Sequence, residues 1–425
     1  MFKRIFESTL FRSSGIYTIS SVLNNAIPFL MIPILTRYLS PVDYGIVAMF
    51  QVLFSFISPF VGLNAYGAIH QKYYNRETVD FPKYIGNGLL ILIVSTCIVS
   101  GMVWLFAGPI STLSAFPANW LWSVIIFSVG YFLNLTVLLL WVGQKKPILF
   151  GVLQVVQTLI NLSISIWLVV SLSMGWQGRI LGQVIAVGGL GILSLFIMWK
   201  QWRFKLEFDR NYLRHILNFG VPLVPYYLGL TVMMLVDRFF ITNMIGLAET
   251  GIYMLGYQFG QIIVLLYESF NKAYVPWLYE RLKMKNEAMN LKIVKLTYLI
   301  FFGILIMASL LCFIVPLVFH LVVGKEFMGA SVYVLWITFG YAFNSMYKVV
   351  ANNIFYTEKT QVVAWITIIT GVFHVGLNYS LINLLGAIGA AQACLLSFFI
   401  CFIITWVWSN KLHPMPWFFF LNKKK

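Results

Sequence analysis

The sequence predicts an all-α integral membrane protein that crosses the bilayer about twelve times. Of its 425 residues, 60% are hydrophobic and only 10% are charged, whereas a soluble domain carries about 25% charged residues. Many separate apolar stretches of about 20 residues follow one another, and each is long enough for one membrane-spanning helix. Helices satisfy their own backbone hydrogen bonds, as lipid requires, and no alternating pattern of a membrane barrel is visible.

Six apolar runs form the first half of the predicted bundle. The first follows a polar segment that is too short to hold a cleavable signal peptide. The second is preceded by Ser40, Pro41 and Asp43, which predict the N-cap, N1 and N3 positions of a capping box. Polar or charged connections separate the remaining runs. The predicted spans are residues 14–36, 44–68, 84–106, 120–141, 148–172 and 180–199.

Six further runs form the second half. We expect an N-terminal half at residues 1–200, a basic cytoplasmic linker at 201–218 and a C-terminal half at 219–425. Prolines inside the spans predict kinks; these are Pro28, Pro33, Pro222, Pro225 and Pro316. The predicted spans are residues 219–245, 251–274, 294–323, 332–355, 362–384 and 388–408.

The two halves resemble each other. Residues 43–46, at the start of the second span, are echoed by residues 249–252 at the start of the eighth. Gly175-x-x-Gly178 returns as Gly386-x-x-Gly389 after nearly the same number of residues. Since transporters are commonly built from internal repeats, we expect two six-helix halves related in parallel.

Basic residues predict the orientation. Of the 29 Lys and Arg residues, Arg37, Arg179 and Lys325 fall on one side of the predicted membrane and Arg238 falls within a span, while all the others lie on the opposite side. The basic side is cytoplasmic by the positive-inside rule, which places both termini in the cytoplasm. The net charge of +16 is thereby explained by topology and anionic lipid, so nucleic acid is not an expected partner.

The loops and reactive side chains favour no enzyme. The predicted outer loops are short and hold only the carboxylates Asp43, Glu249 and Glu326. No phosphate-binding glycine-rich motif occurs, and no His or Cys spacing suggests a metal site or a cofactor. An integral-membrane acyl- or glycosyltransferase stays open as an alternative because Glu280 and Glu287 lie on the cytoplasmic side.

Asp237 and Arg238 lie in the middle of the seventh predicted span. A charge there costs several kcal/mol unless it is paired or hydrated, so such residues normally face a cavity or a partner. Adjacent helical residues point about 100° apart, and the two therefore cannot both face one direction. A structural ion pair and a functional cation are both compatible with this pattern.

Five other polar residues in or beside spans are candidates. Glu268 and Lys272 are four residues apart and can pair on one face of the eighth span, while Lys348 can snorkel toward the cytoplasm. Arg37 breaks the positive-inside trend, and its guanidinium suits phosphate oxygens. His374 lies deep in a span, where a neutral imidazole bonded to a neighbouring helix competes with a proton-relay role.

Two segments resemble a known family. Residues 24–45 resemble the opening of the Wzx family of O-antigen and polysaccharide-unit flippases, and residues 237–240 with 246–253 are similar to that family's seventh and eighth helices. The resemblance implies the V-shaped bundle of the multidrug, oligosaccharidyl-lipid and polysaccharide exporter superfamily. It also implies a bacterial inner-membrane location, and a polysaccharide polymerase and a chain-length regulator as partners beside membrane lipids.

The resemblance implies that the cargo is an undecaprenyl-diphosphate-linked oligosaccharide. Its charged head needs a positive, hydrated path through a low-dielectric layer, and Arg238, Arg37 and Lys272 are the matching cations. Asp237, Glu268, Lys348 and His374 are then candidates for the lumen or for ion coupling. The rival is a drug:cation antiporter of the same superfamily, for which a lumen dominated by acids is expected.

Overall fold

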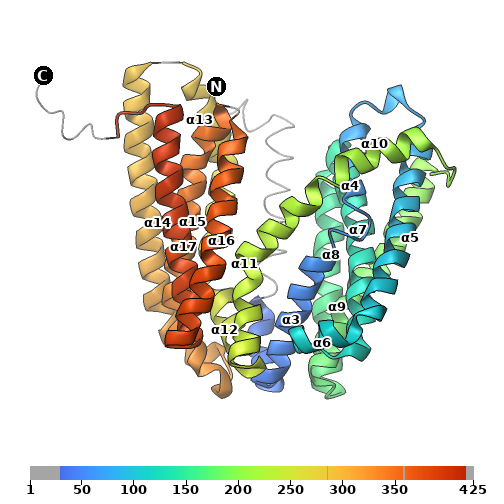
Figure 1. Cartoon of the computed structure of the whole chain (residues 1–425), viewed down its shortest axis with the longest axis horizontal. Coiled ribbons are helices and arrows are strands. Elements are labelled where there is room, and N and C mark those ends of the chain that lie inside the picture. The colour runs from blue at the N-terminus through green and yellow to red at the C-terminus, as the bar shows by residue number, and fades with distance from the viewer. Residues whose placement is uncertain (1–28, 285, 358, 418–425) are drawn as a thin grey trace, which may run out of the picture. The chain divides into compact units, whose positions relative to one another are not determined.

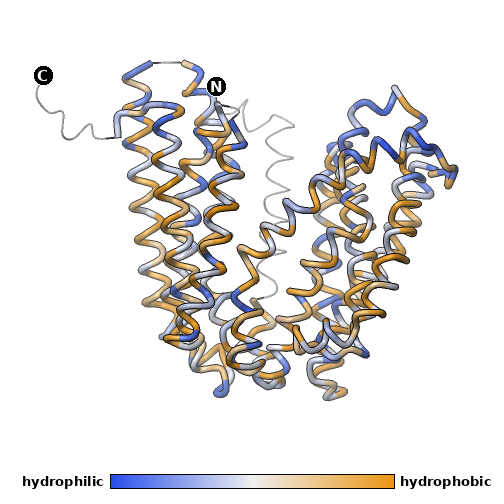
Figure 2. The backbone as a smooth tube through the Cα atoms, in the orientation of Figure 1, coloured by the Kyte–Doolittle hydropathy of each residue, from blue (hydrophilic) through white to orange (hydrophobic). Residues whose placement is uncertain are grey.

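The computed structural model describes residues 29–417 except 285 and 358, and every regular element in this part of the chain is helical (Figure 1). Eight of the described helical segments are long and apolar enough to cross a membrane. Figure 2 shows hydrophobic residues along these helices and hydrophilic residues at their connections. The all-α class is confirmed, and the count of twelve spans stays a prediction because most of the first span lies outside the described residues.

The chain divides into two compact units, Met1–Gly251 and Ile252–Lys425. Helix α12 (Leu247–Gly260) spans the division. Its first turn packs on the start of α3 (Pro41–Ile57), where a Cβ on Gly45 would lie 2.0 Å from the carbonyl oxygen of Leu247. The predicted boundary at residues 201–218 separates two sequence repeats, whereas the division at Gly251 separates two sets of contacting helices. The predicted boundary therefore stays a prediction.

The N-terminal unit holds two buried apolar clusters, one around Phe132 and Tyr84 and one around Phe50 and Phe116. Helix α7 crosses both clusters and packs against α9 and α4. The described helices of this unit before α12 are Phe29–Tyr38, α3 (Pro41–Ile57), α4 (Ala65–Tyr73), α5 (Phe81–Leu105), α6 (Ala107–Ser114), α7 (Leu121–Gly143), α8 (Pro147–Ile166), α9 (Gly175–Trp202), α10 (Arg210–Gly220) and α11 (Leu223–Met244), with short turns η1 (Arg76–Thr78), η2 (Ala118–Trp120) and the π turn η3 (Trp167–Ser171).

The C-terminal unit is built around α15, which packs against α13, α14 and α17. Its buried side includes Tyr341 and Asn352. Helix α16 lies against α17. The elements after α12 are α13 (Ile262–Leu282), α14 (Glu287–Val322), η4 (Lys325–Ala330), α15 (Ser331–Tyr356), α16 (Thr360–Leu385) and α17 (Ala387–Leu412).

The predicted capping box is confirmed at the start of α3. The Ser40 hydroxyl accepts the Asp43 backbone N–H at 3.2 Å, and the Asp43 carboxylate accepts the Ser40 backbone N–H at 3.0 Å. Pro41 occupies the first turn, where its missing N–H has no helical partner to lose. Ser40 and Asp43 therefore each satisfy one backbone donor that has no partner within the helix.

Two predicted continuous spans are wrong in detail. The run 44–68 is divided into α3 and α4 by a non-helical segment at residues 58–64, and the run 251–274 is divided at Gln261 between α12 and α13. The predicted seventh span also begins earlier, because α10 is joined to α11 by a turn at Val221 and Pro222 and the two helices together form one candidate span, Arg210–Met244. Hydropathy does not detect such breaks, since the side chains in them are largely apolar.

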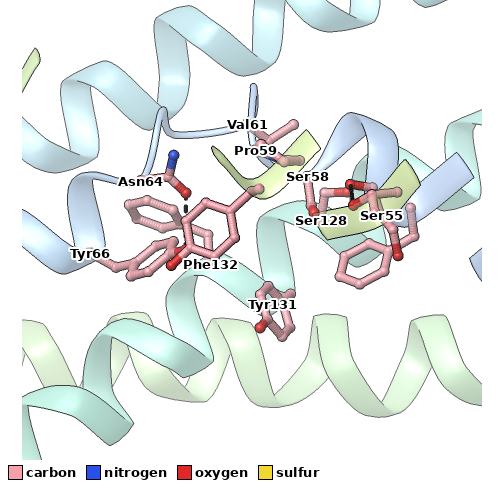
Figure 3. A pocket seen from close by; sticks show the side chains of 12 residues that line it. Ser55, Ser58, Pro59, Val61, Asn64, Tyr66, Ser128, Tyr131 and Phe132 are labelled. Atoms are coloured by element: carbon pink, nitrogen blue, oxygen red, sulfur yellow. Dashed lines mark hydrogen bonds between the residues drawn. The ribbon is translucent and has the colours of Figure 1, made fainter. Parts of the chain in front are cut away.

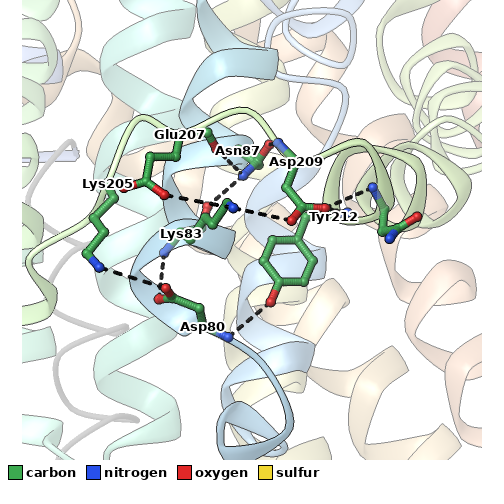
Figure 4. Close-up of polar contacts among 8 residues, drawn as sticks. Asp80, Lys83, Asn87, Lys205, Glu207, Asp209 and Tyr212 are labelled. Atoms are coloured by element: carbon green, nitrogen blue, oxygen red, sulfur yellow. Dashed lines mark hydrogen bonds and ion pairs between the residues drawn. The ribbon is translucent and has the colours of Figure 1, made fainter.

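One end of the N-terminal unit is joined by ion pairs (Figure 4). The Lys83 ammonium lies 3.4 Å from the Asp209 carboxylate and 3.8 Å from that of Glu207, and Lys205 lies 3.9 Å from Asp80. The Tyr212 hydroxyl accepts the Asp80 backbone N–H. The segment after α4 and the segment after α9, both predicted to be cytoplasmic, therefore lie together at the same end of this unit.

Candidate functional site

The break between α3 and α4 begins at Pro59. In a continuous helix, residue 59 would donate its N–H to the carbonyl of Ser55, but proline has no N–H. The Thr231 hydroxyl of α11 donates to that carbonyl instead, at 3.3 Å. Helix α11 thus supplies the hydrogen bond that α3 loses, as an irregular segment inside a membrane protein requires.

The break continues through Gly62, Leu63 and Asn64, which all have positive φ. Side chains from other helices stabilise it: the Ser95 hydroxyl of α5 accepts the Gly62 backbone N–H at 2.8 Å, and the Asn64 amide donates to the Gly220 carbonyl at 3.2 Å. The Asn64 side chain is 2% exposed. Two non-Gly residues in the left-handed region mark a segment held by its surroundings.

Gly220 is the point where the break meets the junction of α10 and α11. A Cβ on Gly220 would lie 1.9 Å from the Leu63 carbonyl oxygen and would overlap with it. Only glycine permits the two backbones to approach this closely. The discontinuity of α3–α4 and the discontinuity of α10–α11 are therefore in direct backbone contact.

A cavity of about 200 Å³ lies beside this break (Figure 3). Its wall comes from the end of α3, the break itself, the start of α4, and the facing sides of α7 and α11. None of the lining residues carries a charge. They are Phe54, Ser55, Ser58, Pro59, Val61, Asn64, Tyr66, Ser128, Tyr131, Phe132, Tyr227 and Thr231.

Asp237 and Arg238 lie about two turns beyond Thr231 on α11 and are each 2% exposed. The Arg238 guanidinium donates to the Met234 carbonyl at 3.2 Å, and the Asp237 carboxylate accepts the Arg238 backbone N–H at 2.8 Å. Both charges are thus covered by protein and engaged in polar contacts. Their predicted role in the lumen stays a prediction.

The other two predicted cations are exposed. Arg37 lies at the end of the helix Phe29–Tyr38 in the N-terminal unit, and Lys272 lies on α13 in the C-terminal unit. The N-terminal unit therefore contains Arg37 and Arg238, and the C-terminal unit contains Lys272.

The predicted pair of Glu268 with Lys272 is wrong. Glu268 of α13 pairs with Lys348 of α15, and these side chains are 42% and 28% exposed. The Asn352 amide donates to Asn271 at 3.0 Å one turn away. Lys348 therefore reaches a carboxylate on a neighbouring helix, a contact between distant residues that sequence spacing does not reveal.

His374 is 2% exposed and bonds to a neighbouring helix. Its Nδ1 lies 3.0 Å from the Ser397 hydroxyl of α17, and its Nε2 lies 3.1 Å from the Asn378 amide. The contact with Ser397 joins α16 to α17. The choice between a structural imidazole and a proton relay stays a prediction.

A comparison with protein families decides the affiliation. Residues 10–282 match the family described as polysaccharide biosynthesis protein. The chain belongs to this polysaccharide biosynthesis protein family. The resemblance to polysaccharide-unit flippases seen in the sequence is thereby confirmed.

Two relatives of this family member come from Haemophilus influenzae. One, described as an uncharacterized membrane protein, is 26% identical over 377 residues, which cover 87% of this chain and 89% of the relative. The other, Lsg locus putative protein 1, is 23% identical over 379 residues and covers 86% and 90%.

Solved structures share the fold at low identity. The lipid II flippase MurJ in an inward closed conformation gives a TM-score of 0.71 at 16% identity, over 96% of this chain and 87% of MurJ. An inward-facing multidrug resistance MATE transporter of the MOP superfamily gives 0.64 at 16% identity, over 93% and 94%. The polysaccharide biosynthesis family member is thus a multi-pass membrane protein with the MOP fold.

Sequence reasoning missed two polar sites of this family member. The cavity residues were placed in continuous apolar spans, although Pro59 and Gly62 inside one run are a signal of a break. Arg179 of α9, counted only as an outer charge, donates to the Asn161 side chain at 2.8 Å and to the Ser165 hydroxyl at 2.8 Å. Both acceptors lie on α8 just before its π turn.

Proposed function

We propose that this protein is a flippase, not an enzyme, that moves an undecaprenyl-diphosphate-linked oligosaccharide from the cytoplasmic to the periplasmic leaflet of a bacterial inner membrane. The observation that carries the proposal is membership of the polysaccharide biosynthesis family together with the fold of a lipid II flippase. MurJ is a lipid II flippase, and the extension of that activity to this chain is part of the proposal.

The helix breaks support alternating access. Transporters commonly bind their substrates where membrane helices are discontinuous, and they move one part of the bundle against another. The N-terminal unit contains two such discontinuities, at residues 58–64 and at Val221 and Pro222, and they contact each other through Gly220. Local rearrangement of these segments breaks few regular hydrogen bonds.

The charges complete the proposal. A lipid diphosphate carries negative charge, and its passage through a low-dielectric region is favoured by cations along the path. We assign this role to Arg238, with Arg37 and Lys272, and we assign lumen or ion-coupling roles to Asp237, Glu268 and Lys348. The polyprenyl tail stays in lipid, and a polymerase and a chain-length regulator use the delivered units.

A drug:cation antiporter is the alternative that the MATE fold likeness supports. Such a transporter is expected to bind cations through carboxylates. Asp237, at 2% exposed, is the one buried carboxylate among the described residues. It accepts a hydrogen bond from the backbone N–H of Arg238. The cavity of the N-terminal unit has no carboxylate among its lining residues, which favours the flippase.

The test is deletion of the gene and complementation. We expect the deletion strain to lose surface polysaccharide and to retain lipid-linked units in the inner leaflet. Wild type restores the polysaccharide, Arg238→Lys restores it in part because it keeps the positive charge, and Arg238→Ala restores it least. Arg210→Ala, which removes an exposed arginine at the start of α10, is the matched control and complements like wild type.

Membrane levels of each variant are measured alongside, so that loss of transport is separated from loss of protein. Normal polysaccharide in the deletion strain contradicts the flippase and favours the antiporter. Equal complementation by all Arg238 variants removes the cationic role from Arg238 and leaves the flippase standing.

A further inference from the structure

We propose that the cavity beside the α3–α4 break binds one uncharged sugar ring of the transported glycan. This inference rests on the proposed function and names the part of the substrate that this site takes. The cavity lies within the N-terminal unit and is separate from the charged residues Asp237 and Arg238, which are not among its lining residues.

The absence of charge from the wall decides between ligand classes. Serine and threonine hydroxyls, tyrosine phenols and one amide supply all the polar side-chain groups of the cavity. A diphosphate buried there would have no cation, and a cationic drug would have no carboxylate, so each would carry a large desolvation cost. A neutral ligand rich in hydroxyl groups carries no such cost.

The hydrogen bonds already made on the wall favour a ligand that donates. The Thr231 hydroxyl donates to the Ser55 carbonyl, the Ser128 hydroxyl donates to the Val124 carbonyl at 2.7 Å, and the Tyr66 hydroxyl donates to Asn64 at 3.0 Å. A hydroxyl whose proton is used still has acceptor lone pairs. These three hydroxyls therefore present acceptor lone pairs, which match the O–H donors of a sugar.

Aromatic rings provide the remaining contact surface. Phe54 packs edge to face on Tyr131 with ring centroids 5.2 Å apart, and Tyr66 packs edge to face on Phe132 at 5.7 Å. Figure 3 shows the rings of Tyr66, Tyr131 and Phe132 around the cavity. A sugar ring has apolar C–H faces as well as polar edges, and a wall of aromatic faces with a few fixed polar groups is the usual composition of a small-molecule site.

The volume limits the ligand to one ring. Cavities for drug-sized ligands are typically about 300–1,000 Å³, whereas this one is about 200 Å³. Since Thr231 and Asn64 also join the break to α11 and to Gly220, a ring bound here contacts the same residues that hold the two helix discontinuities together.

Binding of neutral methyl glycosides to the purified full-length protein tests the proposal. Saturation-transfer NMR is run with methyl glucoside, methyl galactoside and methyl N-acetylglucosaminide. Inorganic pyrophosphate and tetraphenylphosphonium are then added as charged competitors of the glycoside signal, with sodium chloride as a salt control. We expect at least one glycoside to bind. Tyr227→Phe and Tyr131→Phe each remove a hydroxyl of the wall and weaken binding by about 3- to 10-fold, as expected for one hydrogen bond.

Tyr226→Phe is the matched control, because Tyr226 is adjacent to Tyr227 in the sequence, is 57% exposed and is not a lining residue. It leaves glycoside binding unchanged. Glycosides that fail to bind, or that bind all variants equally, overturn the sugar site. Displacement of a bound glycoside by pyrophosphate or tetraphenylphosphonium, beyond the effect of sodium chloride, also overturns it.

Complementation separates this proposal from the proposed function. If wild type restores surface polysaccharide while Tyr227→Phe and Tyr131→Phe both complement and bind glycosides like wild type, the sugar site is wrong and the flippase stands. If deletion leaves surface polysaccharide normal, the flippase is wrong regardless of the glycoside result.

Discussion

Single residues decide where the backbone of the N-terminal unit leaves the helix. Pro59 removes one donor, Thr231 and Ser95 satisfy backbone groups at the break, and Asn64 satisfies the Gly220 carbonyl at the end of α10. In water such groups would bond to solvent, but inside a membrane protein each unsatisfied group costs several kcal/mol. These polar side chains are therefore structural, and Thr231 and Asn64, which also line the cavity, are candidates for ligand contact as well.

Gly220→Ala is expected to destabilise the protein. The added methyl would lie 1.9 Å from the Leu63 carbonyl oxygen, so one backbone must shift, and overpacking of this kind costs about 1–3 kcal/mol. Thermal unfolding in detergent should show a lower Tm. Gly229→Ala on α11, with no atom within 4 Å of its Cβ position, is the matched control and leaves the Tm unchanged or slightly higher. Equal effects of both substitutions would rule out the close contact.

At the scale of elements, the cap of α3 can be recognised in the sequence, whereas contacts between distant helices cannot. The capping box before α3 is local, since Ser40 and Asp43 are three residues apart and bond each other. The contacts of Asn64 with Gly220 and of Lys348 with Glu268 join helices far apart in the chain. A local pattern is visible in one sequence, whereas a contact between distant helices depends on how they pack.

The cap of α10 predicts a pH dependence. The Asp209 carboxylate accepts hydrogen bonds from the backbone N–H groups of Tyr212 and Asn211. The Tyr212 bond, followed by the Asn211 bond and the Lys83 ammonium, holds the pKa of Asp209 below its usual value. A depressed pKa stabilises the folded state above the unfolded pKa of about 3.9. That contribution is lost as the pH falls through the lower folded pKa.

Asp209→Asn retains a capping side chain and removes the charge, which isolates this effect. Thermal unfolding between pH 7 and pH 3 should show wild type more stable than Asp209→Asn near pH 7, with the difference shrinking below about pH 4. A difference in Tm that stays constant over this range would show that ionisation of Asp209 contributes nothing to the stability of the cap.

At the scale of the whole molecule, the length of α5 allows the predicted topology to be tested. Its 25 residues extend about 37 Å at 1.5 Å per residue, enough to cross a hydrocarbon core of about 30 Å. Glu77 and Asn119 are exposed in the segments that precede and follow α5 and α6. The positive-inside rule places Glu77 in the cytoplasm and Asn119 outside.

Labelling with a membrane-impermeant maleimide distinguishes the two sides. In a background with the four cysteines replaced, Asn119→Cys should react in intact cells, and Glu77→Cys should react only after the cells are opened. If only Glu77→Cys reacts in intact cells, the orientation is the reverse of the predicted one. If both cysteines react in intact cells, the predicted orientation is rejected.

The sequence by itself determined the all-α membrane class, the approximate position of most spans, the cap of α3 and the resemblance to polysaccharide flippases. These follow from composition, from the length of apolar runs and from residues close together in the chain. Tertiary structure alone decided which side chains stabilise the break at residues 58–64, the partner of Glu268 and the uncharged cavity. Each of these depends on side chains from separate helices meeting in space, which the order of residues along one helix does not record.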